Sequence, residues 1–215
     1  MRDKKIIIFD LDGTLVDSAE NISRAINFVR HDSELPPLDK DFITTNINRD
    51  DINPAMLFYG VESFTSRHKE LFEGYYMDIC IENICYYEHI PEVLMKFKSF
   101  DYALSVATNG TSGFAKKILS SLNLDAMFDQ FVGSDMVSSP KPSPDMLHLI
   151  LDNYGYSNNH YAPFLVGDSI KDVKSAKNAG IKSAFARWGF GDDVDGADEH
   201  LSSADELERL MAYFN

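Results

Sequence analysis

After residue 85 the chain alternates between short apolar segments and segments with helical spacing, and this alternation most constrains its fold. Five segments are strand-like: 5–9, which opens the chain and is rich in β-branched residues, and 102–108, 130–132, 163–168 and 181–186. Segments with helical periodicity lie between and after them: 91–100, 112–122, 144–154, 170–179 and 204–213. Strands that alternate with helices form a parallel, doubly wound sheet. We therefore predict an α/β protein with a Rossmann-like core.

Residues 16–85 interrupt this alternation and contain no strong strand signal. Ser18 is a predicted N-cap, and the helical stripe after it consists of Ile22, Ala25, Ile26 and Val29. Shorter helical pieces follow, and then a longer predicted helix over 63–84. We therefore predict an α/β core formed by 1–15 and 86–215, with a helical domain inserted at 16–85.

The charge of the chain limits its partners. Its 20 basic and 34 acidic residues give a formal net charge of −14, and 44% of its residues are hydrophobic. Such a field repels nucleic-acid backbones and anionic membrane surfaces, so we expect neither as a partner. A small phosphorylated ligand stays possible where a cation neutralises the site locally. We expect a monomer or a weak dimer.

The sequence also favours a cytoplasmic location. The apolar run at 6–9 is too short for a signal peptide, and no stretch approaches the ~20 apolar residues of a membrane span. The two cysteines, Cys80 and Cys85, form no CxxC pair, which favours reduced thiols over a disulfide or metal site.

Polar residues gather where the predicted strands end. In parallel sheets ligands bind at the carboxyl ends of the strands. The residues that the order of the chain brings to this edge are Asp10 and Asp12, Thr108 and Asn109, Lys141 in a proline-rich loop, Asp168, and Asp172 one helical turn later. Several carboxylates, one hydroxyl and one lysine are thus expected at the same edge.

The carboxylates have structural alternatives. Asp12-Gly13 is a common turn pair, but Asp10 follows four buried apolar residues, where an unpaired carboxylate is costly and a metal ion would compensate it. Asp168 and Asp172 could be a helix N-cap and a solvated helix residue, although their i,i+4 spacing keeps them on one face. We favour a functional role for all of these aspartates.

The remaining residues carry weaker signals by themselves. Lys141 alone would be a surface lysine, distinguished only by the prolines on both sides of it. Thr108 and Asn109 alone form an ordinary Thr-Asn-Gly turn after a strand. Their chemistry depends on being brought beside the aspartates.

The predicted set suits phosphoryl transfer. Oxygen ligands favour a hard cation, so Mg²⁺ is the expected cofactor. A carboxylate is a competent nucleophile towards phosphorus, and a cation, a lysine and a hydroxyl can neutralise the equatorial phosphoryl oxygens. A second carboxylic acid two residues further along can protonate the leaving oxygen and later deprotonate water.

Four motifs in order resemble one known family. They are "FDLDGTLVDS", "ATNG", "SPKPSPDM" and "VGDSIKD", and they span nearly the whole chain. On these motifs the chain is similar to the haloacid dehalogenase-like superfamily, in its phosphoglycolate-phosphatase-like branch. A match to all four in order is highly specific. The resemblance implies a phosphatase whose inserted helical domain is a cap that closes over the substrate.

The resemblance also implies roles for individual residues. Asp10 would be the nucleophile and Asp12 the general acid and base, while Thr108 and Lys141 would hold the transferring phosphoryl group. Asn109, in the second motif, would bind substrate.

The same resemblance implies a metal site. Asp10, the main-chain carbonyl of Asp12 and Asp168 would bind Mg²⁺, and Asp172 would support them from behind. Relatives that cleave carbon–halogen or carbon–phosphorus bonds carry other residues at position 12, so the aspartate there favours phosphate ester chemistry.

The inserted domain departs from the phosphoglycolate phosphatase pattern. The segment "FITTNINRDDINPAM" lacks an expected Gly-Pro loop, which leaves the substrate open. We hypothesise that Asn46, Asn48 and Arg49 contact the leaving group of the substrate. The alternative is a solvated loop between helices.

The sequence favours one function over three alternatives. The leading one is a Mg²⁺-dependent phosphatase for a small phosphorylated metabolite, and the alternative within enzymes is a sugar phosphomutase. A signalling receiver domain also uses an acidic Mg²⁺ pocket, but it is shorter and lacks a large insertion after its first strand. A non-catalytic binding protein on this fold would lack a key group, and none is missing here.

Overall fold

A six-stranded parallel sheet forms the centre of the protein. The computed structural model describes residues 4–157 and 161–214. The strand order is β5-β4-β1-β6-β7-β8, and every neighbouring pair is parallel. The strands are β1 (Lys5–Phe9), β4 (Tyr102–Thr108), β5 (Gln130–Gly133), β6 (Phe164–Gly167), β7 (Lys182–Ala186) and β8 (Glu199–Leu201). The predicted α/β fold class, with a doubly wound parallel sheet, is confirmed.

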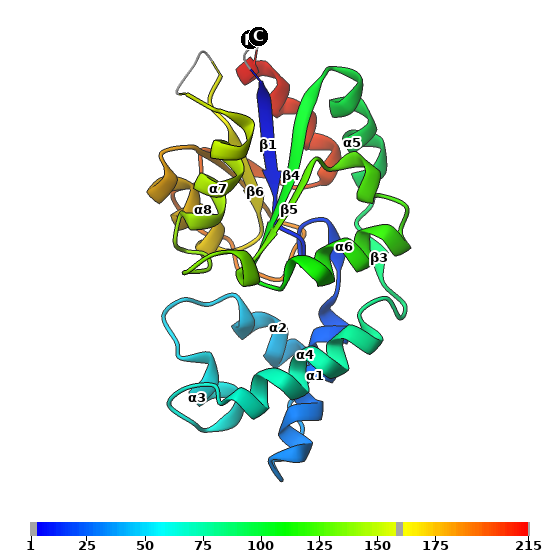
Figure 1. Ribbon diagram of the computed structural model, residues 1–215, viewed down its shortest axis with the longest axis vertical. Helices are drawn as coiled ribbons and strands as arrows, with labels where there is room; N and C mark the ends of the chain where they lie inside the picture. Colours follow the sequence, from blue (N-terminus) through cyan, green and yellow to red (C-terminus); the bar gives the residue numbers. More distant parts are fainter. Residues whose placement is uncertain (1–3, 158–160, 215) are drawn as a thin grey trace.

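Helices cover both faces of this sheet (Figure 1). One apolar cluster includes residues of α5 (Ile90–Ser99), α6 (Ser112–Ser121) and the 3-10 helix η3 (Ala204–Phe214), and the other includes residues of α7 (Asp145–Tyr154) and α8 (Ile170–Ala179). Short 3-10 turns flank β5 at η1 (Asp125–Met127) and η2 (Ser134–Met136).

The run of isoleucines in β1 supplies both of these clusters. Ile6 and Ile8 belong to the cluster with α7 and α8, while Ile7 and Phe9 belong to the other one. All four side chains are fully buried. An apolar run without alternation is expected for a parallel strand that is covered on both faces.

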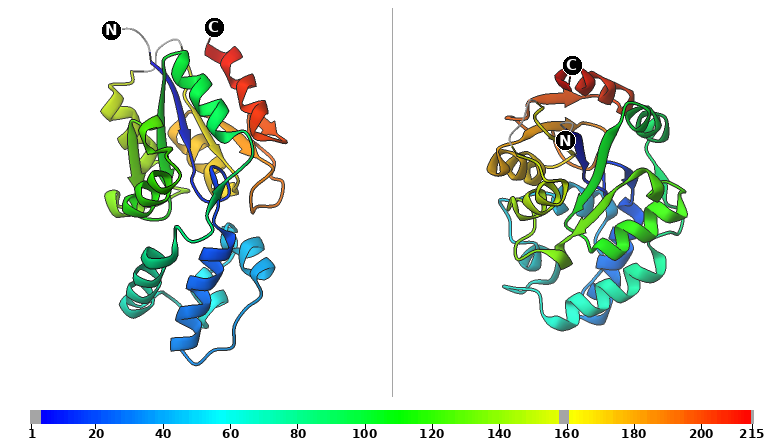
Figure 2. Two further views of the ribbon diagram at one scale, coloured as in Figure 1. Left: turned by 90° about the vertical axis from the view of Figure 1, so that its right-hand side faces the viewer. Right: turned by 45° about the horizontal axis from the view of Figure 1, so that its top comes forward.

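Four helices form a separate layer beyond the carboxyl ends of the strands (Figure 1). They are α1 (Ala19–Asp32), α2 (Lys40–Ile47), α3 (Pro54–Tyr59) and α4 (Ser66–Ile79), and we call them the helical layer. The chain reaches this layer through β2 (Val16–Asp17) and returns through β3 (Cys85–Tyr86). These two short strands pair antiparallel, and both connections run together at the junction (Figure 2).

Some elements differ from the sequence prediction. The helix predicted over 63–84 is shorter, because Thr65 caps it at its start in a reciprocal capping box with His68 and it ends at Ile79. The strands β2, β3 and β8 were not predicted. Each has only two or three residues, too few for any periodicity to register.

Two further features concern the chain as a whole. Within the described ranges, none of the helices combines the length and the apolar character needed to cross a bilayer. Cys80 is buried and Cys85 is exposed, and both are free thiols.

Asn21 of α1 forms hydrogen bonds that link this helix to the end of α4. Its buried amide donates to the carbonyls of Ile79 (2.7 Å) and Glu82 (3.0 Å). Asn21→Ala leaves these carbonyls without that donor, so we expect the free energy of unfolding to fall by about 1–3 kcal/mol. Thermal or urea unfolding measures this loss.

The matched control is Asn153→Ala. Asn153 also lies in a helix, but its amide donates to Gln130 at the surface (2.8 Å). We expect this variant to stay within about 0.5 kcal/mol of the unchanged protein. Equal losses in the two variants would contradict the role assigned to Asn21.

Candidate active site

Asp10 and Asp168 extend two adjacent central strands towards the helical layer. Asp10 follows β1, and its main-chain N–H donates to the carbonyl of Val166 (2.8 Å), which continues the β1–β6 pairing. Asp168 follows β6 in the same way. Adjacent parallel strands therefore deliver both carboxylates to one edge of the sheet.

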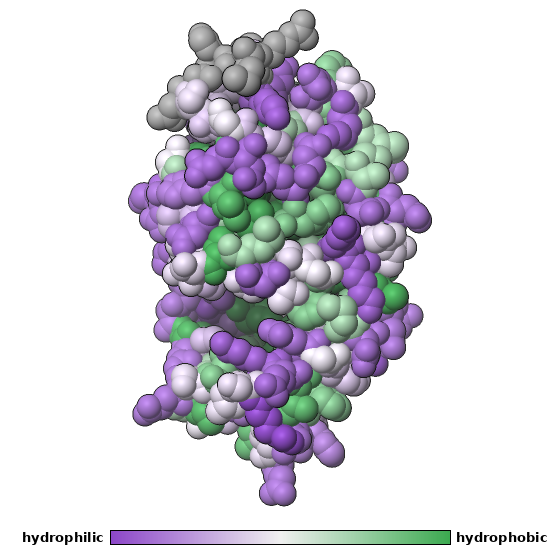
Figure 3. Space-filling view, viewed as in Figure 1, coloured by the Kyte–Doolittle hydropathy of each residue, from purple (hydrophilic) through white to green (hydrophobic). Residues whose placement is uncertain are grey.

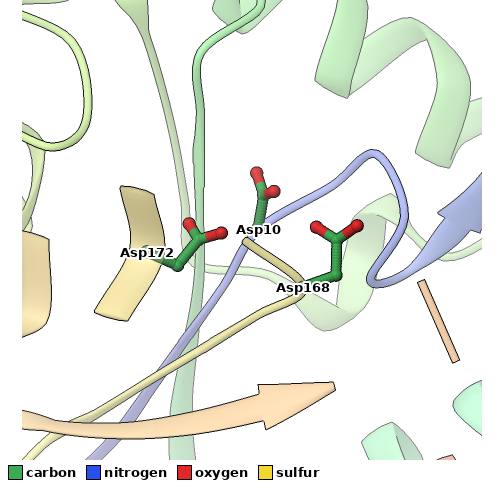
Figure 4. Close-up of side chains that lie close together, drawn as sticks. All are labelled: Asp10, Asp168 and Asp172. Carbon is green, nitrogen blue, oxygen red and sulfur yellow. The ribbon is translucent and has the colours of Figure 1, made fainter. Parts of the chain in front are cut away.

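Three buried aspartates meet at this edge. One carboxylate oxygen from each of Asp10, Asp168 and Asp172 lies within 4.8 Å of the other two. Figure 4 shows the three side chains arranged around one space, Asp10 from the first strand and the other two from the segment that runs into α8. The sequence predicted this gathering of carboxylates, and the structure brings all three together.

Lys141 lies between two of these carboxylates. Its Nζ is 2.7 Å from Asp10 Oδ1 and 2.6 Å from Asp172 Oδ1, and the lysine side chain is buried. Burial acts to lower the pKa of Lys141, but Asp10 and Asp172 outweigh it and leave that pKa raised. The lysine is therefore held as a cation inside the site.

Asp172 is fixed on its other side by its own helix. Its Oδ2 accepts hydrogen bonds from the N–H (3.2 Å) and the hydroxyl (2.5 Å) of Ser169, while the Ser169 hydroxyl accepts from the Asp172 N–H in a capping box. The N-cap of α8 is thus Ser169, one residue after Asp168. With its two oxygens divided between Lys141 and Ser169, Asp172 positions the lysine.

One lysine does not neutralise three buried carboxylates. Burial raises the pKa of Asp10 to about 7, and Lys141 opposes this rise. Burial, followed by the charge of Asp10, raises the pKa of Asp168 well above its usual range. Among the described residues, the buried Asp168 Oδ1 also has no hydrogen-bond partner. An excess of buried negative charge with an unpaired oxygen fits a hard divalent cation bound to carboxylate oxygens.

Asp12 lies beside this cluster and is held by two hydroxyl groups. Its Oδ1 is 2.5 Å from the Ser18 hydroxyl and 3.4 Å from the Tyr76 hydroxyl. Burial raises the pKa of Asp12, and these two hydrogen bonds act against that rise. Ser18 does occupy the N-cap position of α1, but its side chain makes no capping bond and serves Asp12 instead.

Tyr76 is a site residue that the sequence did not predict. It comes from α4 in the helical layer, 64 residues after Asp12, and its side chain is buried. Burial, and then the charge of Asp12, raises the pKa of Tyr76. The tyrosine therefore stays protonated, and its hydroxyl can donate a hydrogen bond to Asp12. A tyrosine on an amphipathic helix resembles any core aromatic residue, so no sequence signal marks it.

Thr108 and Asn109 reach the site from the end of β4. Thr108 is buried, and its hydroxyl oxygen accepts the N–H of Gly110 (3.0 Å), which leaves the hydroxyl proton available to donate. The Asn109 amide group accepts the Lys141 N–H (2.9 Å) and donates to the Lys141 carbonyl (2.9 Å). Asn109 therefore holds the main chain that carries the lysine.

A cavity of about 350 Å³ opens from these residues towards the helical layer. Asp10, Asp12, Thr108, Asn109 and Lys141 line its inner end. The space-filling view shows a hollow at the junction between the sheet and the helical layer, with hydrophobic surface at its floor (Figure 3). A ligand that reaches the carboxylates must pass between these two parts of the molecule.

The family is decided by comparison with known proteins. The family model described as "Haloacid dehalogenase-like hydrolase" matches residues 7–186, which include every motif of the site. The chain belongs to this family.

Relatives and solved structures support this family membership. The chain is 32% identical over 186 residues to a phosphoglycolate phosphatase of Aquifex aeolicus, and the match covers 86% of each chain. A haloacid dehalogenase-like hydrolase of Streptococcus pneumoniae superimposes with a TM-score of 0.81 at 25% identity over the full length of both chains. A predicted phosphoglycolate phosphatase of Haemophilus somnus shares the fold, with a TM-score of 0.82 at 24% identity over 98% of this chain and 99% of the other.

The predicted family resemblance, to the phosphoglycolate-phosphatase-like branch, is thereby confirmed. So is the predicted enzyme class, a hydrolase of the phosphatase type.

The three residues proposed from the inserted segment differ in their placement. Asn48 lines the cavity, and its amide donates to Asp168 Oδ2 (3.1 Å). Asn46 donates to the carbonyl of Phe42 within its own helix, and Arg49 is exposed and paired with Asp51. Neither Asn46 nor Arg49 is among the described residues that line the cavity. A contact of these two with substrate stays a hypothesis.

Gly13 is needed for the close approach of its loop to Asp168. Its φ is +80°, a conformation that favours glycine, and a Cβ there would lie 2.2 Å from Asp168 Oδ2. That oxygen also accepts the N–H of Phe190 (2.7 Å). A side chain at position 13 would therefore displace a carboxylate of the site.

Gly13→Ala tests this requirement, with Gly60→Ala as a matched control. Gly60 also has positive φ (+70°), but a Cβ there would meet no atom within 4 Å. We expect both variants to lose about 1–2 kcal/mol of stability from backbone strain. Only Gly13→Ala should lose phosphatase activity, by about 100-fold or more, since catalytic groups must be held closely. Unfolding curves and phosphate release check the two effects, and equal activity in both variants would refute the steric role.

Proposed function

We propose that this protein is a Mg²⁺-dependent phosphatase that hydrolyses a small phosphorylated metabolite, a phosphomonoester, through an aspartyl-phosphate at Asp10. The observation that carries the proposal is the buried Asp10 carboxylate, which lies beside Lys141 and beside Asp168. Asp168 Oδ1 has no hydrogen-bond partner within residues 4–157 and 161–214. The phosphatase relative from Aquifex aeolicus supports an ester of phosphate as the substrate. The name of that relative, phosphoglycolate phosphatase, does not identify the leaving group of this chain's own substrate.

The metal site that we propose uses oxygen ligands. Asp10, Asp168 and the main-chain carbonyl of Asp12 would hold Mg²⁺, and Asp172 would act through Lys141. When bound, the cation neutralises charge on the phosphoryl oxygens during transfer.

The first chemical step is assigned to the two aspartates of the first motif. A carboxylate oxygen of Asp10 attacks phosphorus, and the bond from phosphorus to the ester oxygen breaks. Asp12 gives its proton to that leaving oxygen, so the product alcohol departs neutral. Lys141 donates to the phosphoryl oxygens from one side and the Thr108 hydroxyl from another.

The second step regenerates the enzyme. Asp12, now ionised, takes a proton from water while the water oxygen attacks the phosphorus on Asp10. The bond between Asp10 and phosphorus breaks, inorganic phosphate leaves, and Asp12 is again protonated. Ser18 and Tyr76 keep Asp12 in place for both proton transfers, because both hydroxyl groups lie at its Oδ1.

We further propose that residues 16–85 act as a cap that closes over the substrate. Two contacts support this role, since Asn48 of the helical layer reaches Asp168 and Tyr76 reaches Asp12. Opening the cap would break both contacts and admit water to the cavity. Closing it would exclude water and fix the acid.

Asp10→Asn tests the nucleophile. Because an amide does not attack phosphorus as a carboxylate does, we expect phosphate release to fall at least ~10³-fold. The control is Asp17→Asn, since Asp17 is exposed and lies seven residues further along the chain, in β2. Release of phosphate without a bisphosphate activator distinguishes the phosphatase from a phosphomutase. Mg²⁺-dependent activity that survives in Asp10→Asn would sink the assignment.

Removal of divalent metal tests the cofactor. We expect dialysis against a chelator to abolish phosphate release and Mg²⁺ to restore it. Bound Mg²⁺ should also stabilise the fold by about 2.7 kcal/mol at a concentration 100 times its Kd, which thermal unfolding detects without any substrate. The control is Asp168→Asn, which should lose most of this stabilisation. An unchanged unfolding temperature in the presence of Mg²⁺ contradicts the proposed site.

A further inference from the structure

The part of the cavity that lies beyond the carboxylates is apolar. Its wall comes from two sides: from the helical layer through α1, α2, α3 and α4, and from the core through α6. The residues that form it include Ile22, Ile26, Ile47, Phe58, Phe72 and Phe114. With the phosphoryl group bound by the inner end, this wall faces the leaving group of the ester.

Two lysines of the cavity lining, the buried Lys141 and the half-buried Lys171, already have partners in the protein. The ammonium group of Lys141 is shared by Asp10 and Asp172, as described above. Lys171 also lines the cavity, but its Nζ donates to the carbonyl of Ile47 (3.0 Å). Lys141 is therefore committed to the inner end, and Lys171 gives one of its N–H donors to the main chain of α2.

The other charged residues of the lining lie towards its rim on α4. Lys69 and Glu73 are both exposed and stand one helical turn apart, where water solvates their charges. The ring of His68 takes part in the capping box with Thr65 and packs against Tyr59, with 4.9 Å between ring centroids. Within the described part of the chain, the cavity lining thus contains no buried cation that is free to bind a second anion.

The size of the cavity also argues against a small anionic leaving group. At about 350 Å³ it lies within the range of pockets that hold ligands larger than a two-carbon acid. A small leaving group would leave apolar side chains without contacts, and their dispersion energy would not be gained. A carboxylate there would be desolvated among isoleucine and phenylalanine side chains, which is costly.

We infer that the site takes phosphate monoesters whose leaving alcohol is apolar and ring-sized, in preference to a small anionic ester such as 2-phosphoglycolate. This inference rests on the proposed phosphatase function. The reaction itself is unchanged: water replaces the alcohol on phosphorus, and the products are the alcohol and inorganic phosphate. What the apolar wall adds is binding of the ring.

Three esters test the inference on the full chain with Mg²⁺. They are benzyl phosphate, ethyl phosphate and 2-phosphoglycolate, and phosphate release gives kcat/KM for each. Benzyl and ethyl alcohols are both primary alcohols of similar basicity, so a difference between their esters reports contact with the ring. We expect kcat/KM for benzyl phosphate to exceed that of both other esters by about 10- to 100-fold, the scale on which apolar pockets discriminate.

Two substitutions on one helix locate the effect. Phe72→Ala removes a half-buried ring from the wall and should lower kcat/KM for benzyl phosphate about ten-fold more than for ethyl phosphate. Tyr75→Ala is the matched control, because Tyr75 is half-buried on the same helix but stacks on Phe28 (4.2 Å between centroids) instead of lining the cavity. Its benzyl-to-ethyl ratio should not change.

A third substitution adds what the wall lacks. Ile47→Lys places a cation in the apolar wall and should raise kcat/KM for 2-phosphoglycolate relative to benzyl phosphate. This gain supports the inference even where Phe72→Ala unfolds, which thermal unfolding of each variant detects.

The outcomes separate the inference from the function on which it rests. Phosphate released from all three esters without a preference for the ring, or a preference for 2-phosphoglycolate, overturns the inference and leaves the phosphatase intact. No phosphate released from any ester, with the fold and Mg²⁺ binding retained, overturns the proposed function and the inference with it.

Discussion

The ion pairs of Lys141 with Asp10 and Asp172 are the interaction on which the site depends. Two central strands end in aspartates at one edge, and a helix begins there with a third. Unpaired carboxylates could not be buried so close together, because their repulsion and lost hydration would exceed the gain from packing. Lys141 neutralises part of the carboxylate charge, which makes part of this burial possible. The negative charge that it leaves uncompensated favours a bound cation.

Much of the core could be predicted from the sequence because it follows from short-range patterns. The β1 segment is an uninterrupted apolar run, and such a run is typical of a parallel strand that is buried on both faces. Since the carboxyl ends of parallel strands share an edge, the motifs after β1, β4 and β6 had to meet there. The strand β8 escaped prediction because it has three residues, two of them Glu199 and His200, and owes its place to pairing with β7.

The contacts between the sheet and the helical layer could not be predicted in the same way. Tyr76 reaches Asp12 across 64 residues of sequence, and no local pattern distinguishes it from a core tyrosine. Ser18 was predicted as an N-cap on sound local grounds, yet its hydroxyl belongs to Asp12. Asn48, which we expect at the leaving group, lines the cavity and also donates to Asp168 from the helical layer. Each of these depends on how one part of the fold is placed over another.

The polar end and the apolar wall of the cavity reinforce each other. Charges interact more strongly where water and mobile dipoles are excluded, so the apolar side chains above Asp10 strengthen the hold of Lys141 on a phosphoryl group. A wall of cations would bind a second anion but would also draw water and counter-ions into the cavity. The chain therefore obtains its electrostatic strength from a few buried charges beneath an apolar cover. The same cover then selects the leaving group by its shape and surface.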